Sequence, residues 1–199
     1  MSVTLEELKK TLLYSEELGI ELAQNTDDEL FKWFLASTLF GARISERIAK
    51  NTYRTFEKYN ILEPKKILEA GWDFLVNPVM REGGYVRYDF KTSTKILRIC
   101  EKLLIEYNGS LKRLYEESKD KKDLERRLLN FYGVGPVTVN IFLRELRPYW
   151  KKADPEPLAI VRKIARKFDI DLNDFNRKSV TFTRIEAGLI RLRKKLVNL

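Results

Sequence analysis

The sequence predicts an all-α fold. Apolar residues recur at spacings of three and four along most of the chain, as on the buried face of an amphipathic helix. No segment sustains the alternation of apolar and polar residues that is typical of a half-buried strand. With 199 residues, of which 44% are hydrophobic and 34% charged, the chain has the length and balance of a globular protein with a sizeable core.

Two Thr-x-x-Glu patterns predict helix starts near the beginning of the chain. Thr4 with Glu7, and Thr26 with Glu29, match a capping box, in which both side chains bond the first backbone N–H groups of a helix. Gly41 is placed to end the second of these helices. The helices expected in this half span residues 5–23, 26–41, 45–58 and 64–75.

The middle of the chain predicts a loop followed by a long helix. Residues 81–89, REGGYVRYD, are expected to form the loop because of their paired glycines. The next segment is apolar-periodic up to Gly109, and Cys100 falls on its apolar side as a core residue. Asp120 or Asp123 is expected to cap a later helix. The remaining helices outside the hairpin are expected over residues 90–107, 111–116, 158–168 and 183–197.

Residues 128–146, LLNFYGVGPVTVNIFLREL, predict two helices joined by a very tight hairpin. Gly133 would end the first helix in the left-handed region, where a side chain is strained. Gly135 would let a partner approach the backbone closely, and Pro136 suits the first turn of a helix. The exposed N–H groups at the second helix's N-terminus are suited to bind an anion such as a DNA phosphate. The alternative is a tight turn with no ligand.

The segment GVGPVTVNIFLREL resembles the helix-hairpin-helix element of the endonuclease III-like DNA glycosylase superfamily, also called HhH-GPD, whose pattern is about L-P-G-V-G-x-x-T-A. FKWFLASTLFGARISERIAK and GGYVRYDFKTSTKILRICEKLLIEYNGSL are similar to other parts of that family, so the ordered match covers roughly residues 29–168. The resemblance implies two helical lobes with DNA across the cleft between them. The implied lobes are residues 1–40 with 151–199, and residues 41–150 including the hairpin at 124–146.

The composition of the chain limits which classes of partner and cofactor are expected. The formal net charge of +9 favours a polyanion such as nucleic acid. The chain has no histidine, which excludes histidine triads and histidine metal sites, and its single cysteine excludes the four-cysteine iron–sulfur cluster of many relatives. No cofactor is therefore expected, although the resemblance allows a monovalent cation at the carbonyls of Gly133 and Gly135.

The location expected from the sequence is intracellular, in the cytoplasm or nucleoid. No apolar run reaches membrane-spanning length, and the N-terminus lacks the apolar stretch of a signal peptide. A single glutamine and two methionines beside abundant lysine and glutamate favour a thermophilic source.

The resemblance implies a set of DNA contacts around the hairpin, made to double-stranded DNA with a damaged base flipped out. Tyr85 and Tyr88 are expected to stack on that base, with an aromatic loop packed on its own domain as the alternative. Arg43 matches a turn whose residues fill the gap left by the base, although a solvent-exposed arginine is equally compatible. The residues expected to contact DNA are Gly133, Val134, Gly135, Val137, Thr138, Arg43, Arg87 and Arg162.

The position of Val137 predicts which chemistry is absent. Bifunctional relatives have a lysine two residues after the second hairpin glycine, which attacks the sugar and cuts the strand through a Schiff base. Valine stands at that position here, so lyase activity is not expected. The resemblance therefore implies a monofunctional base-excision-repair glycosylase that hydrolyses the N-glycosidic bond of a damaged base.

Two registers compete for the catalytic carboxylate. Spacing from the hairpin selects Asp154, with Glu156 as second choice, to stabilise an oxocarbenium-like state or activate water. The family's downstream pattern fits Arg162 and Arg166 only if the carboxylate position is Pro157. Asp154 is equally compatible with a helix cap. The alternatives are a catalytically inactive protein of the same fold that binds damaged or structured DNA, and an unrelated helical interaction protein. A carboxylate of Asp154 or Glu156 facing the interlobe cleft would favour the enzyme.

Overall fold

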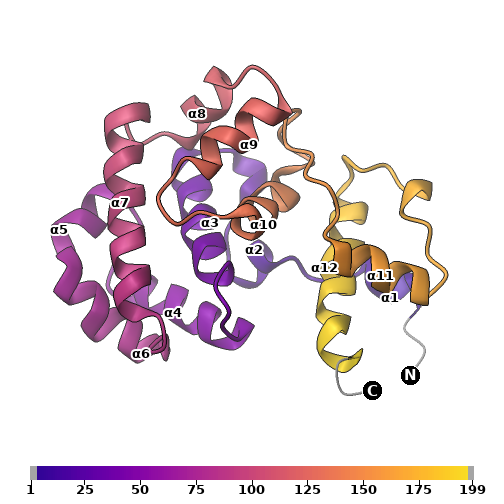
Figure 1. Ribbon diagram of the computed structural model, residues 1–199, viewed down its shortest axis with the longest axis horizontal. Helices are drawn as coiled ribbons and strands as arrows, with labels where there is room; N and C mark the ends of the chain where they lie inside the picture. The colour runs from indigo at the N-terminus through magenta and orange to yellow at the C-terminus, as the bar shows by residue number, and fades with distance from the viewer. Residues whose placement is uncertain (1–3, 197–199) are drawn as a thin grey trace.

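The computed structural model describes residues 4–196, and the fold over this range is all-α without strands (Figure 1). The α-helices are α1 (Leu5–Lys9), α2 (Tyr14–Glu17), α3 (Asp27–Phe40), α4 (Glu46–Lys58), α5 (Pro64–Phe74), α6 (Arg81–Gly83), α7 (Asp89–Tyr107), α8 (Leu111–Glu117), α9 (Lys121–Leu129), α10 (Pro136–Leu146), α11 (Ala159–Lys167) and α12 (Val180–Leu196). Shorter helical turns are η1 (Leu22–Gln24), η2 (Leu75–Met80) and η3 (Leu172–Asp174). Each helix in this range is too short or too polar to span a lipid bilayer.

Two hydrophobic cores divide the chain into lobes. The large lobe, residues 14–153, packs around α3, whose Trp33 and Phe34 are completely buried. The small lobe, residues 4–9 with 158–196, packs Leu8 of α1 against α11 and α12. In Figure 1 the small lobe stands apart on the right, where indigo α1 lies against orange α11 and yellow α12. Segments 10–13 and 154–157 connect the lobes.

The boundary between the lobes differs from the expected one. The resemblance places residues 14–40 in the same lobe as the C-terminal helices, but the buried residues of α2 and α3 belong to the core of the large lobe. The reason is that α3 is apolar on nearly all sides. Every residue from Glu29 to Leu39 except Lys32 is buried. A helix that is apolar on nearly all sides forms the centre of a core rather than its edge.

The single helix predicted over residues 5–23 is broken. The capping box of Thr4 and Glu7 is present, but α1 ends at Lys9 and the chain crosses to the large lobe. The N–H groups of Tyr14 and Ser15, at the start of α2, donate to the Glu145 carboxylate at 3.1 and 3.0 Å. A buried carboxyl group that accepts these N–H groups stabilises a new helix start there, so tertiary contact overrides the local helical pattern.

Most other predicted helices agree closely with the structure. Asp120 caps α9 by accepting the Asp123 N–H at 2.9 Å. The predicted loop 81–89 contains the short helix α6 before it turns into α7. The last helix begins three residues earlier than expected, at Val180, and its predicted end at residue 197 lies outside the described residues.

The helix-hairpin-helix consists of α9, a tight connection and α10. Gly133 has the predicted left-handed φ, +69°, but it does not end the first helix, because α9 already ends at Leu129 with Asn130 as its C-cap. Gly41 at the end of α3 has an ordinary helical φ of −70°, so its role is different. A Cβ there would overlap the Thr138 hydroxyl of α10. This close approach fixes the turn at 41–45 beside the start of α10.

Candidate nucleic-acid interface and interlobe cavity

The N-terminus of α10 presents free backbone donors. Gly135 is the N-cap, and no side chain caps the helix. Within residues 4–196, the N–H groups of Gly135, Val137 and Thr138 donate to no other group. Nothing lies within 4 Å of the position that a Cβ on Gly135 would occupy, so the backbone is open to a ligand. These donors and the helix dipole favour an anion.

Two of the predicted hairpin contacts are directed inward instead. The Val134 N–H donates to Phe131 O at 3.1 Å, and the Val134 side chain is buried. The Thr138 side chain is also buried, against Gly41. These side chains hold the hairpin against the core, and only the N–H of Thr138 can reach a ligand.

Cations surround the hairpin. Arg43, Lys91 and Arg98 are exposed and form no ion pair within the described part of the chain, and Arg98 stacks on the ring of Tyr132 at 4.3 Å. Lys95 lies beneath Gly133 and donates to Thr38 O at 3.3 Å. Burial lowers the pKa of Lys95 to about 8. Unpaired cations next to free N–H groups are suited to contact phosphates.

The two tyrosines predicted to stack on a base lie in different surroundings. Tyr85 is completely buried and donates its hydroxyl to Leu39 O at 2.9 Å, and burial raises its pKa to about 12. Its ring is not available for stacking, which corrects the prediction. Tyr88 is half-buried in a depression beside Gly133, with the exposed guanidinium of Arg87 5.2 Å from its ring centre.

Helix α11 adds a basic face on the small lobe. Its exposed cations lie on one side of the helix and are Arg162, Lys163, Arg166 and Lys167. Arg162 pairs weakly with Glu156 at 3.9 Å, whereas the other three form no ion pair among residues 4–196. Arg162 also lines a groove with Pro136 at the start of α10, so this face continues the surface around the hairpin.

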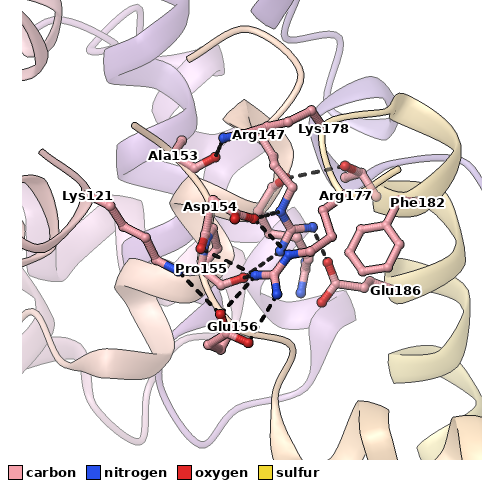
Figure 2. Close-up of polar contacts among 12 residues, drawn as sticks. Lys121, Arg147, Ala153, Asp154, Pro155, Glu156, Arg177, Lys178, Phe182 and Glu186 are labelled. Carbon is pink, nitrogen blue, oxygen red and sulfur yellow. Dashed lines mark hydrogen bonds and ion pairs between the residues drawn. The ribbon is translucent and has the colours of Figure 1, made fainter. Parts of the chain in front are cut away.

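Asp154 is held by two arginines (Figure 2). Its Oδ1 lies 3.2 Å from Nε of Arg147 and 3.0 Å from Nε of Arg177. Arg147 is completely buried, donates to Pro155 O at 2.6 Å and pairs with the buried carboxylate of Glu186 on α12. Asp154 therefore connects Arg147 at the end of α10 with Arg177 in the segment before α12, while Arg147 itself reaches α12 through Glu186. It does not cap α11, whose N-cap is Leu158.

Glu156 belongs to the same cluster at its exposed edge. The Arg177 guanidinium donates to both Glu156 oxygens at 3.1 Å, and Lys121 lies 3.3 Å away. These partners, Arg177 first, lower the pKa of Glu156. Sequence reasoning missed Arg147, Arg177 and Glu186. No motif marks them, because Arg177 reaches back 21 and 23 positions to Glu156 and Asp154, and Arg147 pairs with Glu186 across 39 positions.

A cavity of about 600 Å³ lies between the lobes. Its walls come from the end of α3 and the turn to α4, from α10, and from Leu158 and α12. The lining residues are Tyr14, Phe40, Gly41, Ala42, Arg43, Ile44, Ser45, Glu46, Val137, Ile141, Arg144, Leu158, Ile190 and Arg193. Neither predicted catalytic carboxylate, Asp154 or Glu156, lines this cavity. Glu46 does, held by Lys50 at 2.8 Å and by the Tyr14 hydroxyl at 3.3 Å.

No family model, curated protein or solved structure matches this chain. The resemblance to the helix-hairpin-helix glycosylases therefore rests on the residues of this chain alone.

Proposed function

We propose that the chain binds duplex DNA in the manner of helix-hairpin-helix glycosylases and accommodates an extruded base between its lobes. The observation behind this proposal is the uncapped N-terminus of α10, with free N–H groups at Gly135, Val137 and Thr138. Unpaired cations on the adjacent turn, on α7 and on α11 extend the basic surface to both lobes. Phosphate contacts of this kind give affinity without sequence preference.

The same geometry argues against hydrolysis by Asp154. A catalytic carboxylate must face the sugar of the extruded nucleotide, but Asp154 bonds Arg147 and Arg177 outside the cavity. The position that the family pattern assigns to the carboxylate is Pro157, which has none. Binding of damaged or structured DNA without base release at Asp154 is therefore the function that the geometry supports best.

One observation favours a second candidate, a monofunctional DNA glycosylase that uses Glu46. Its carboxylate lines the cavity, and Lys50 and the Tyr14 hydroxyl hold it in place. An ionised carboxylate beside the sugar would stabilise the positive charge of an oxocarbenium-like state. A panel of duplexes, each with one damaged base, tests this through alkaline cleavage at abasic sites. Base release that Glu46→Gln abolishes would establish the enzyme and replace the binding-only proposal.

Gly135 provides a clean test of DNA binding. Its backbone is extended (φ −106°, ψ 175°) and the space around its Cβ position is empty, so a side chain introduces no strain. In Gly135→Asp, the new carboxylate would cap α10 and repel a phosphate. We expect about tenfold weaker binding to a 20-base-pair duplex at 0.1 M salt, measured by fluorescence anisotropy.

Gly135→Asn is the matched control, because asparagine also caps the helix but has no charge. It should bind DNA more tightly than Gly135→Asp. Equal affinity of wild type and Gly135→Asp would contradict a phosphate contact at this terminus, and absence of duplex binding by the wild type would refute the proposed function.

A further inference from the structure

The interlobe cavity has an apolar interior and a charged opening. Its inner wall includes Tyr14 and Arg144, which are 6% and 1% exposed. At its opening, Arg43 and Arg193 are exposed to solvent. The apolar lining residues are Phe40, Ile44, Val137, Ile141, Leu158 and Ile190. A planar, mostly apolar group fits such walls, while an anionic group attached to it fits the opening.

Arg144 has donors without acceptors. Its Nε and Nη1 atoms are buried and have no hydrogen-bond partner within residues 4–196. Its Nη2 lies 3.8 Å from Glu145 Oε1, too far for a hydrogen bond. A buried polar group without a partner is costly, and such groups are rare in native proteins unless a ligand or water bonds them.

Glu145 does not supply the missing acceptors. Its carboxylate balances the charge of Arg144, but it already accepts the N–H groups of Tyr14 and Ser15 at the start of α2. The ring of Tyr14, 5.8 Å from the guanidinium, offers only its face. The pairing with Glu145 thus explains why a charge is tolerated at this depth, and it leaves two nitrogens without an acceptor in the described chain.

The ligand must present acceptors, because a guanidinium has only donors. Guanine presents O6 and N7 side by side, and thymine and uracil present O4, all of which suit an arginine. Adenine places an amino donor beside N7, where it would face the donors of Arg144. The nucleobases that suit this cavity are therefore those with an exocyclic carbonyl on the inward edge.

We propose that the interlobe cavity selects an extruded nucleobase with an exocyclic carbonyl, whose oxygen accepts hydrogen bonds from Arg144. The apolar walls contact the base, and Arg43 and Arg193 at the opening lie on the side of its phosphates. This inference rests on the proposed function for how the base arrives, and it adds the class of base that is accepted.

The test uses wild-type protein and duplexes with one unpaired, easily extruded nucleotide. Competition anisotropy compares a bulged dG or dU with a bulged dA in the same sequence context. We expect about tenfold tighter binding of the carbonyl-bearing bases, the discrimination typical of a good arginine–base contact. Equal affinities for dA, dG and dU would overturn the proposal without any mutation.

Variants assign the preference to Arg144. Arg144→Lys retains the charge that faces Glu145 but has fewer and differently placed donors. It should reduce the preference to roughly twofold or less while binding to a fully paired duplex is unchanged. Arg184→Met is the matched control, because Arg184 bonds Glu16 and Thr11 away from the cavity. A preference that survives in Arg144→Lys would refute the role of this residue.

Free nucleosides separate this inference from the proposed function. If no duplex binds, the proposed function fails, and calorimetry with deoxyguanosine and deoxyadenosine then tests the cavity by itself. Binding of deoxyguanosine alone, lost in Arg144→Lys, would support the site, and binding of neither nucleoside would overturn it. Competition by inorganic phosphate, with dAMP binding as well as dGMP, would identify a phosphate site and overturn the assignment of a base.

Discussion

Arg144 and Arg147 lie one helical turn apart at the C-terminal end of α10 and are equally buried, but their surroundings differ. Arg147 donates hydrogen bonds from both terminal nitrogens, to Glu186 and to Pro155 O, and its Nε lies 3.2 Å from Asp154 Oδ1 in an ion pair without hydrogen-bond geometry. Arg144 faces the interlobe cavity, and two of its nitrogens have no partner in the described chain. The comparison teaches that burial alone does not distinguish an arginine that stabilises the fold from one that is proposed to bind a ligand. What differs is whether carboxylate and carbonyl acceptors of the described chain lie against the guanidinium, as they do at Arg147 and do not at Arg144.

The largest effect is expected for Arg147→Met. The change leaves the carboxylate of Glu186 buried without its partner and frees Asp154, so we expect the free energy of unfolding to fall by about 3–5 kcal/mol. Urea denaturation measures the loss. A double variant, Arg147→Met with Glu186→Leu, should regain most of it because no unpaired charge is left. A loss below about 1 kcal/mol would show that Arg147 is not a structural centre.

A smaller loss of stability is expected for Arg144→Met, about 1–2 kcal/mol, because Arg144 makes no side-chain hydrogen bond within residues 4–196 and because Glu145, left without its distant countercharge, still accepts the N–H groups of Tyr14 and Ser15. The same denaturation experiment compares it directly with Arg147→Met. If Arg144→Met were the more destabilising of the two, the assignment of a structural role to Arg147 and a ligand-binding role to Arg144 would be wrong.

Asp154→Asn tests the same arginine cluster by removing the negative charge that Arg147 and Arg177 contact. We expect it to lower the free energy of unfolding by about 1 kcal/mol, because the amide keeps its shape but loses the charge that faces Arg147 and Arg177. Any base release found in the duplex panel should be unchanged. A variant with normal stability and no base release would instead restore Asp154 as the catalytic residue.

The smallest effect concerns pH. The pKa of Glu156 is lowered from 4.5 by Arg177 and Lys121, so its contribution to stability is present above pH 4.5 and is lost as the pH falls through the lower folded value. Because the side chain is exposed, we expect only a few tenths of a kcal/mol. Glu156→Gln should remove this part of the pH dependence of unfolding between pH 5 and about 3. Identical profiles for the two proteins would show that the pair has no net effect.

Local patterns predicted the parts of the fold that depend on local physics. The all-α class, helices such as α3 and α7, the Asp120 cap and the left-handed Gly133 follow from periodicity and from the conformational limits of single residues. The break between α1 and α2 was missed, because it depends on Glu145, which lies 131 positions away from Tyr14.

The candidate site was less predictable for the same reason. The sequence marks the hairpin backbone, whose φ angles and free donors are local properties. The partners of Asp154 and the orphaned donors of Arg144 depend on which segments meet in space. Tyr85 shows the limit clearly, because its place in a glycine-rich loop predicts exposure, whereas the structure buries it beneath α3.

The composition of the small lobe sets an order of events during protein synthesis. Leu8 in α1 packs against Val161 of α11 and Ile185 of α12, which the ribosome makes roughly ten seconds or more later at typical elongation rates. Residues 14–153 can collapse on their own core in that interval. Helix α1 therefore remains unpacked beside a finished large lobe until the last helices emerge, so the small lobe and the interlobe cavity are the last parts of the molecule to be assembled.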